Sequence, residues 1–194
     1  MNKQELIDFE QEIADMFLDK QISSPIHLAG CDIEDSLIEL FKDIKEDDWV
    51  FSTHRSHYHA LLKGIPKEEL KQIILDGNSM HVNSKKYKFF SSSIVGGGLP
   101  IALGVALANK LKGNDEHVWI FVGDMAAEMG VFNECTKYAA RNDLPISFII
   151  EDNGLSTETP TQESWGLCKG DPHIIKFTYK RKWPHVGCGK WVTF

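Results

Sequence analysis

The sequence contains no long hydrophobic run and little cysteine. The opening stretch MNKQELIDFEQEIADMF carries charges throughout, which argues against a signal peptide or a membrane span there. The four cysteines share no CxxC spacing, so we expect free thiols in a reducing compartment. A zinc site built from Cys168 and His173, or from His185 and Cys188, matches no common module. These features predict a cytoplasmic protein without a membrane partner.

The sequence also lacks an excess of basic residues and any internal repeat. It has 21 lysines and arginines against 28 aspartates and glutamates, a net charge of −7, so we expect no broad surface for nucleic acid. A length of 194 residues suits one domain with its own core. We therefore expect residues 1–194 to form a single domain.

The first part of the chain has the periodicity of helices. Over about residues 2–20, apolar residues recur on one face. Asp32 can cap a second helix through IEDSLIELFKDI, and PKEELKQIILDG predicts a third, which begins at Pro66 and ends at Gly77. Residues of about 1–76 are therefore expected to be a helical N-terminal segment.

From Gly97 onward, strand and helix patterns alternate. GGLPIALGVALANKLKG and GVFNECTKYAARN predict helices, whereas HVWIFV, ISFIIE and HIIKFTY predict strands. Short, almost wholly apolar strands separated by helices are typical of a parallel sheet that is covered on both faces. The fold class is therefore predicted to be α/β, with a doubly wound parallel sheet.

Two polar residues follow neighbouring predicted strands. Asp124 follows HVWIFV, and Asn153 follows ISFIIE. The carboxyl ends of adjacent parallel strands lie about 4.8 Å apart and face the crevice where such sheets bind ligands. Carboxylate and amide oxygens suit Mg²⁺, which often bridges to phosphates. Alternatively, Asp124 caps the next helix and Asn153 forms a turn, and spacing alone leaves both readings open.

The sequence around these residues resembles a known family. GDMAAEMG, with DN at Asp152 and Asn153, is similar to the thiamine diphosphate motif. SSIVGGGLPIALGVALA, NECTKYAARNDLPISFIIEDNG, THRSHYHALLKG and NSMH resemble the alpha subunit of the decarboxylating component of pyruvate- and branched-chain-type 2-oxo acid dehydrogenases. The resemblance runs from about His27 to Trp165 and returns weakly at TYKRKWPH.

The resemblance implies roles for particular residues. Mg²⁺ would be held by Asp124, the side chain of Asn153 and the carbonyl of Leu155. The residues implied to bind thiamine diphosphate are His54, Arg55, Ile94, Val95, Gly96, Gly123, Asp124, Met125, Ala126, Asn153 and Leu155. In the family, the segment around Gly96 presents backbone groups to the aminopyrimidine.

His27 and His185 are the residues implied to be catalytic. The family histidine at the His27 position lies near the diphosphate and the reacting carbon, and His185 rests on the weaker C-terminal match. A lone histidine is more often structural, so that reading stays open. The run HRSHYH could also bind a metal, which would compete with phosphate binding by Arg55.

The family also implies a partner. The glutamate that activates the cofactor comes from a beta subunit, and no residue here takes its place, so the resemblance implies an alpha2beta2 heterotetramer that acts on a 2-oxo acid. Gly98, Ala102 and Ala106 recur every four residues, and we expect this stripe at a subunit interface. The alternatives are the N-terminal half of a split transketolase acting on sugars, favoured by Glu128 and SHYHALLKG, and a non-catalytic assembly subunit.

Several residues depart from the family pattern. Met125 replaces a glycine of the motif, and if the backbone there has positive φ, we expect strain of order 1 kcal/mol. Asp152 replaces the first of two paired asparagines. Residues of about 166–171 lack a strand and helix found in the family, which suggests a minimal version of it.

Overall fold

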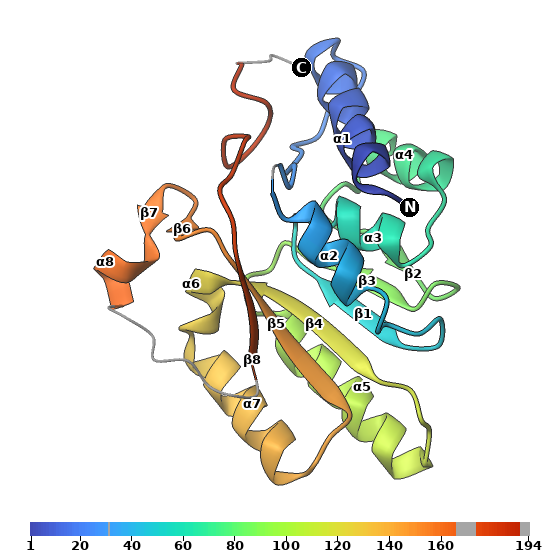
Figure 1. Ribbon diagram of the computed structural model, residues 1–194, viewed down its shortest axis with the longest axis vertical. Helices are drawn as coiled ribbons and strands as arrows, with labels where there is room; N and C mark the ends of the chain where they lie inside the picture. The colour runs from blue at the N-terminus through green and yellow to red at the C-terminus, as the bar shows by residue number, and fades with distance from the viewer. Residues whose placement is uncertain (31, 166–173, 191–194) are drawn as a thin grey trace.

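The computed structural model describes residues 1–30, 32–165 and 174–190. Within this part of the chain, one sheet has six strands, and β2 pairs antiparallel with β3 while every other neighbouring pair is parallel (Figure 1). In spatial order the strands are β2 (Asn83–Ser84), β3 (Phe89–Ser91), β1 (Trp49–Ser52), β4 (Val118–Gly123), β5 (Ile146–Asp152) and β8 (Ile174–Thr178). The predicted α/β class with a mostly parallel sheet is confirmed.

Helices cover both faces of this sheet (Figure 1). One layer consists of α1 (Lys3–Leu18), α2 (Glu34–Leu40), α3 (His57–Leu62) and α4 (Lys67–Leu75). The other consists of α5 (Gly98–Lys112) and α7 (Gly130–Arg141). Short elements complete the fold: α6 (Asp124–Ala127), β6 (Leu155–Ser156), β7 (Thr159–Pro160) and α8 (Thr161–Trp165). Among the described helices, none is long and apolar enough to cross a membrane.

The central strands are apolar on both faces because each face packs on helices. Successive side chains of a strand point to opposite sides of the sheet. Phe121 packs in the core under α1 to α4, whereas Ile120 and Val122 pack in the core under α5 and α7. In β1, Val50 packs in the core under α1 to α4, and Phe51 packs in the core under α5 and α7. The continuous apolar runs in the sequence follow from this two-sided burial.

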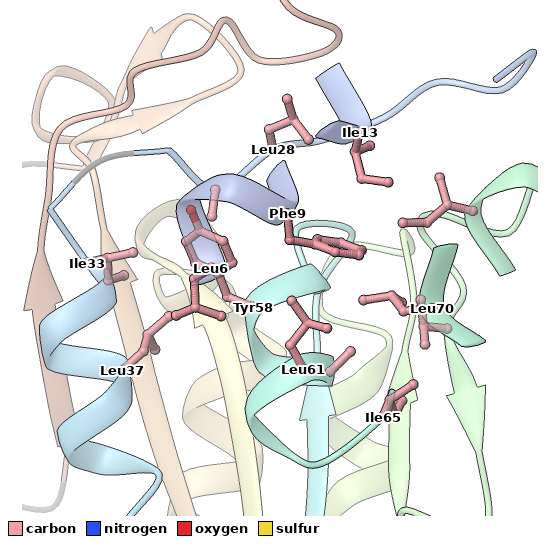
Figure 2. Close-up of a cluster of buried hydrophobic side chains, with 14 of the residues drawn as sticks. Leu6, Phe9, Ile13, Leu28, Ile33, Leu37, Tyr58, Leu61, Ile65 and Leu70 are labelled. Carbon is pink, nitrogen blue, oxygen red and sulfur yellow. The ribbon is translucent and has the colours of Figure 1, made fainter. Parts of the chain in front are cut away.

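Helix α1 packs through one apolar face on the helices α2 and α3. Its N-terminus has a capping box, in which Asn2 and Glu5 exchange hydrogen bonds between side chain and backbone. Figure 2 shows the cluster that this helix joins, which includes Leu6, Phe9, Ile13, Leu28, Ile33, Leu37, Tyr58, Leu61, Ile65 and Leu70. The helices predicted over about residues 2–20 and in GGLPIALGVALANKLKG are both present, as α1 and α5.

Two expectations about the N-terminal segment need correction. The second helix begins at Glu34, its N-cap is Ile33, and Asp32 does not cap it; instead the N–H of Asp32 donates to the Glu34 carboxylate at 2.9 Å. In addition, residues 1–76 are not wholly helical, because β1 lies within them and pairs with both β3 and β4. A strand of four residues is too short to show a period of its own.

The small-residue stripe of α5 packs inside this chain, so its assignment to a subunit interface is wrong. Ala102 and Ala106 are fully buried in the core with Ile120. A Cβ added at Gly98 would lie 3.7 Å from Ile120 Cδ1. Small residues here allow α5 to approach β4 closely.

The packing of α1 gives a first prediction. Phe9→Ala should lower the free energy of unfolding by about 3–5 kcal/mol, because Phe9 is 2% exposed and its loss leaves a cavity. Asp8→Ala, an exposed neighbour on the same helix, should change it by less than about 0.5 kcal/mol. Urea unfolding of both variants measures the difference, and equal effects would contradict the packing.

Candidate functional site

A cavity of about 260 Å³ opens at the carboxyl ends of β1, β4 and β5. It lies where parallel α/β sheets commonly bind ligands. Every residue that the resemblance places at the site lines this cavity: His27, His54, Arg55, Ile94, Val95, Gly96, Gly123, Asp124, Met125, Ala126, Asn153, Leu155 and His185. The fold therefore brings together residues that are up to 158 positions apart, since His27 and His185 share one wall.

Asp124 and Asn153 follow two strands that pair directly. In the parallel register of β4 with β5, Gly123 lies opposite Glu151. Asp124 is 5% exposed and begins α6, and its Oδ2 accepts a hydrogen bond from the Thr161 hydroxyl. The N-cap of α6 is Gly123, so capping by the Asp124 side chain does not explain its position.

Asn153 organises the turn after β5. Its Oδ1 accepts the N–H of Leu155 at 2.9 Å, and its Nδ2 donates to the Tyr179 hydroxyl at 2.9 Å. In the same way, Asp152 Oδ1 accepts a hydrogen bond from the N–H of Gly154 at 2.8 Å. The turn role considered for Asn153 is thus present, and it also aims the loop residue Leu155 at the cavity.

The hydroxyl of Tyr179 is protonated at neutral pH, and burial extends this to higher pH. Burial raises the pKa of Tyr179 to about 12, and Glu151 adds to the effect. Tyr179 therefore anchors Asn153 as a neutral group.

Met125 carries no backbone strain. It lies in the helical turn of α6 and is not among the residues with positive φ, so the strain expected at this position is absent. Gly96 has φ +72°, and a Cβ there would lie 3.2 Å from Val131 Cγ1. Among the motif glycines at the cavity, Gly96 is thus the one whose conformation requires glycine.

The histidines of HRSHYH point to different places. His54 lies against His27 and His185, with ring centroids 4.6 Å and 5.7 Å away. His57 Nε2 lies 3.0 Å from the hydroxyl of Ser79, and His59 Nε2 lies 3.1 Å from Glu151 Oε1. The hypothesis of a metal site within this run is therefore wrong, because its imidazoles do not converge.

Arg55 is buried between the loop that carries His27 and the cavity. Its guanidinium donates a hydrogen bond to the carbonyl of Leu28. Burial, with a contribution from His54 and Arg55, lowers the pKa of His27 to about 3. Burial and Arg55 likewise lower the pKa of His54 to about 4, and both lower the pKa of His185. These three imidazoles are consequently neutral at pH 7.

A buried polar chain joins the ends of β1 and β5. The Ser52 hydroxyl lies 2.7 Å from His59 Nδ1, and His59 Nε2 lies 3.1 Å from Glu151 Oε1. The His59 ring is 1% exposed and stacks on Phe121 of β4, with centroids 4.0 Å apart. Because Ser52 and Glu151 both line the cavity, His59 holds two of its walls across the intervening strand.

Glu10 of α1 holds the loop next to His27. Its two carboxylate oxygens accept the backbone N–H groups of Ala29 and Gly30 at 2.7 Å and 3.0 Å. Burial raises the pKa of Glu10 to about 7, although these hydrogen bonds and Arg55 oppose the shift. A carboxyl group of the first helix therefore supports one wall of the cavity.

Sequence reasoning missed several of these residues. Glu10 interrupts the apolar face of α1, four residues after Leu6 and three before Ile13, and that position was a usable signal. Ser52, His59 and Thr161 gave none. The other partner of His59, Glu151, is 92 positions away, the partner of Thr161, Asp124, is 37 away, and no residue pattern links Ser52 of β1 with His59 of α3.

We expect His59→Phe to lower the free energy of unfolding by about 2–4 kcal/mol. The ring still packs on Phe121, but Ser52 and Glu151 lose their buried partner. The matched control is His81→Phe, since His81 is exposed and bonded to Ser93, and this change should have an effect below about 0.5 kcal/mol. Similar losses in denaturant unfolding of both variants would contradict a structural role for the chain of hydrogen bonds.

Glu10→Gln should change how stability depends on pH. The folded-state pKa of Glu10 is raised from 4.5 to about 7, so its contribution is present below pH 4.5 and is lost as pH rises to about 7. Over this interval the wild type should lose up to about 3 kcal/mol relative to the variant, and the difference should then level off. Urea unfolding of both proteins between these limits measures it, and a constant difference would show that Glu10 does not titrate in this range.

Comparisons with known proteins agree with the resemblance. A family model described as "Dehydrogenase E1 component" matches residues 2–167. The alpha subunit of acetoin:2,6-dichlorophenolindophenol oxidoreductase from Cupriavidus necator is 33% identical over 162 residues, which are 78% of this chain and 48% of that protein. The protein of the same name from Bacillus subtilis is 30% identical over 166 residues, 80% of this chain and 50% of that protein.

A third relative is the pyruvate dehydrogenase E1 component subunit alpha of Rickettsia typhi, which is 31% identical over 167 residues, 80% of this chain and 51% of that protein. The chain thus spans about half the length of these curated relatives. The family match favours the dehydrogenase reading over the split transketolase. Because the matched model covers most of its residues, this chain belongs to the dehydrogenase E1 component family.

Proposed function

We propose that this chain is the alpha subunit of a thiamine diphosphate-dependent enzyme that decarboxylates a 2-oxo acid and transfers the acyl group. The observation that carries the proposal is the convergence of Asp124, Asn153 and Leu155 with Arg55 around one cavity at the strand ends. Family membership supports the same reading. We also propose that the chain forms one cofactor-binding domain and works in the cytoplasm.

The donor groups at the tips of β4 and β5 fit Mg²⁺. Mg²⁺ prefers hard oxygen ligands and retains positions for water and phosphate. The carboxylate of Asp124 offers about four lone-pair sites, and one of its oxygens accepts the Thr161 hydroxyl, while Asn153 Oδ1 keeps a second lone pair beside its bond with Leu155. With the carbonyl of Leu155, these groups would hold the ion.

The opposite wall fits a diphosphate. Arg55 is permanently charged, and its bond to Leu28 leaves other guanidinium donors for phosphate oxygens. His27, His54 and His185 are neutral, so each can donate one N–H to an anion without carrying a charge. The cavity thus offers oxygen ligands for the cation on one side and N–H donors for the anion on the other.

When bound, thiamine diphosphate supplies the nucleophilic carbon and the electron sink for decarboxylation. The residues of this chain bind and orient it: Gly96 with its neighbours Ile94 and Val95 would border the aminopyrimidine, and His27 and His185 would lie near the reacting end. The neutral imidazole of His27 could move a proton there. The activating glutamate is proposed to come from a beta subunit.

An exposed apolar surface supports the proposed partner. Ile94 and Val95 are 71% and 63% exposed at the cavity rim, and Ile101 and Leu111 of α5 are also exposed. Helix α5 is apolar on its outer side as well as its inner side, a property of helices that are covered on both sides. We propose that a beta subunit covers this surface and completes the site in an alpha2beta2 assembly.

Asp124→Ala should remove Mg²⁺-dependent binding of thiamine diphosphate while the protein stays folded, because Asp124 serves a ligand at a strand end. Asp115→Ala is the matched control, since the exposed Asp115 lies before the opposite end of β4. Calorimetric titration of the cofactor with Mg²⁺, with the co-purifying partner chain present, measures binding, and circular dichroism monitors the fold.

Unfolding of Asp124→Ala, or unchanged binding, would overturn the assignment of Asp124. Failure of the wild-type complex to bind the cofactor would instead favour the non-catalytic assembly subunit. Turnover of 2-oxo acids, but not ketose phosphates, by the complex would establish the substrate class.

A further inference from the structure

Three histidines from distant parts of the chain meet at one corner of the cavity. His27 follows α1, His54 follows β1, and His185 lies in the C-terminal segment. The ring centroids of His27 and His185 are 5.1 Å apart, and those of His27 and His54 are 4.6 Å apart. One ring nitrogen from each lies within 4.8 Å of the other two. We call these residues the histidine cluster.

The nitrogens of the histidine cluster are available as ligands. His27 is 7% exposed, and among the described residues its buried Nδ1 has no hydrogen-bond partner, which is unusual for a buried polar atom. A metal ion bound through Nδ1 would satisfy this atom. The lowered pKa values also mean that, at neutral pH, no proton has to leave before a metal binds.

We propose that His27, His54 and His185 form a binding site for a divalent first-row transition metal ion such as Zn²⁺. Three imidazoles with one open position are a common zinc ligand set, and nitrogen donors distinguish this corner from the oxygen donors at Asp124 and Asn153. Zn–N bonds of about 2.0–2.1 Å in a tetrahedron need the nitrogens about 3.4 Å apart, so small rotations of the rings would close the site. The open fourth position would face the cavity.

Arg55 sets the strength of this site. Its positive charge lies close enough to all three imidazoles to lower their pKa values, and the same field weakens the binding of a cation. The second nearby cation, Arg181, is paired with Glu158 at 3.2 Å. Removal of the Arg55 charge should therefore tighten metal binding, which is the opposite of its expected effect on a phosphate.

Metal binding at the histidine cluster would exclude a diphosphate from the same corner. Both ligands need the imidazole nitrogens next to Arg55, so each should weaken the other. The metal site does not depend on the proposed function, because the cluster exists in this chain whether or not a cofactor binds.

The test is a calorimetric titration of Zn²⁺ into the metal-free full chain, without cofactor. We expect one ion per chain, and His27→Gln, His54→Gln and His185→Gln should each lower the affinity by roughly tenfold or more. His81→Gln, a change at an exposed histidine outside the cluster, should leave it unaltered. Arg55→Gln should raise the affinity for Zn²⁺. Co²⁺ bound to the wild type should give the visible spectrum of a tetrahedral nitrogen site, and the three histidine variants should not give it.

No saturable binding by the wild type, or binding that all three cluster variants retain, would overturn the proposal. Circular dichroism would check that each variant is folded, and Arg55→Gln tests the site without removing a ligand. The magnesium and cofactor titration is a separate experiment, so failure of the proposed function and failure of the metal site give different results.

Discussion

The parallel pairing of β4 with β5 determines where the other parts of the candidate site must lie. Because Gly123 and Glu151 are opposite each other in the register, the chain leaves both strands at the same level and on the same edge. A shift of one residue would exchange the side chains of β5 between two closely packed cores, where changes of shape and volume are costly, so the packing specifies the register. The positions of Asp124 and Asn153 are therefore a consequence of core packing.

Buried polar groups stabilise this edge of the sheet where apolar packing ends. Ser52, His59 and Glu151 connect β1 to β5 across β4, and Glu10 ties the loop before α2 to the first helix. In a low-dielectric interior such bonds are directional, and a missing partner is costly. They fix the cavity walls in a way that hydrophobic contacts, which have no direction, cannot.

The sequence predicted the features that repeat along the chain or stand at strand ends. The alternation after Gly97 identified the sheet, and the polar residues after HVWIFV and ISFIIE identified the cavity edge. It did not predict β1, which is too short for a period, or the packing of Ala102 and Ala106 against β4. The resemblance placed His54, His27 and His185 at one site, but residue patterns could not show that their rings meet, because that depends on three segments that only the tertiary fold brings together. Predictions on Cys168, His173 and residues 166–171 lie outside the described residues.

The outward side of α5 has a consequence for how this chain is produced and handled. Its exposed isoleucine and leucine, together with Ile94 and Val95, remain in contact with water when the chain is alone. Any protein that covers them would stabilise the folded form by mass action, so the melting temperature of this chain would depend on the concentration of that protein. Until such a protein is bound, this apolar surface favours aggregation of copies of the chain.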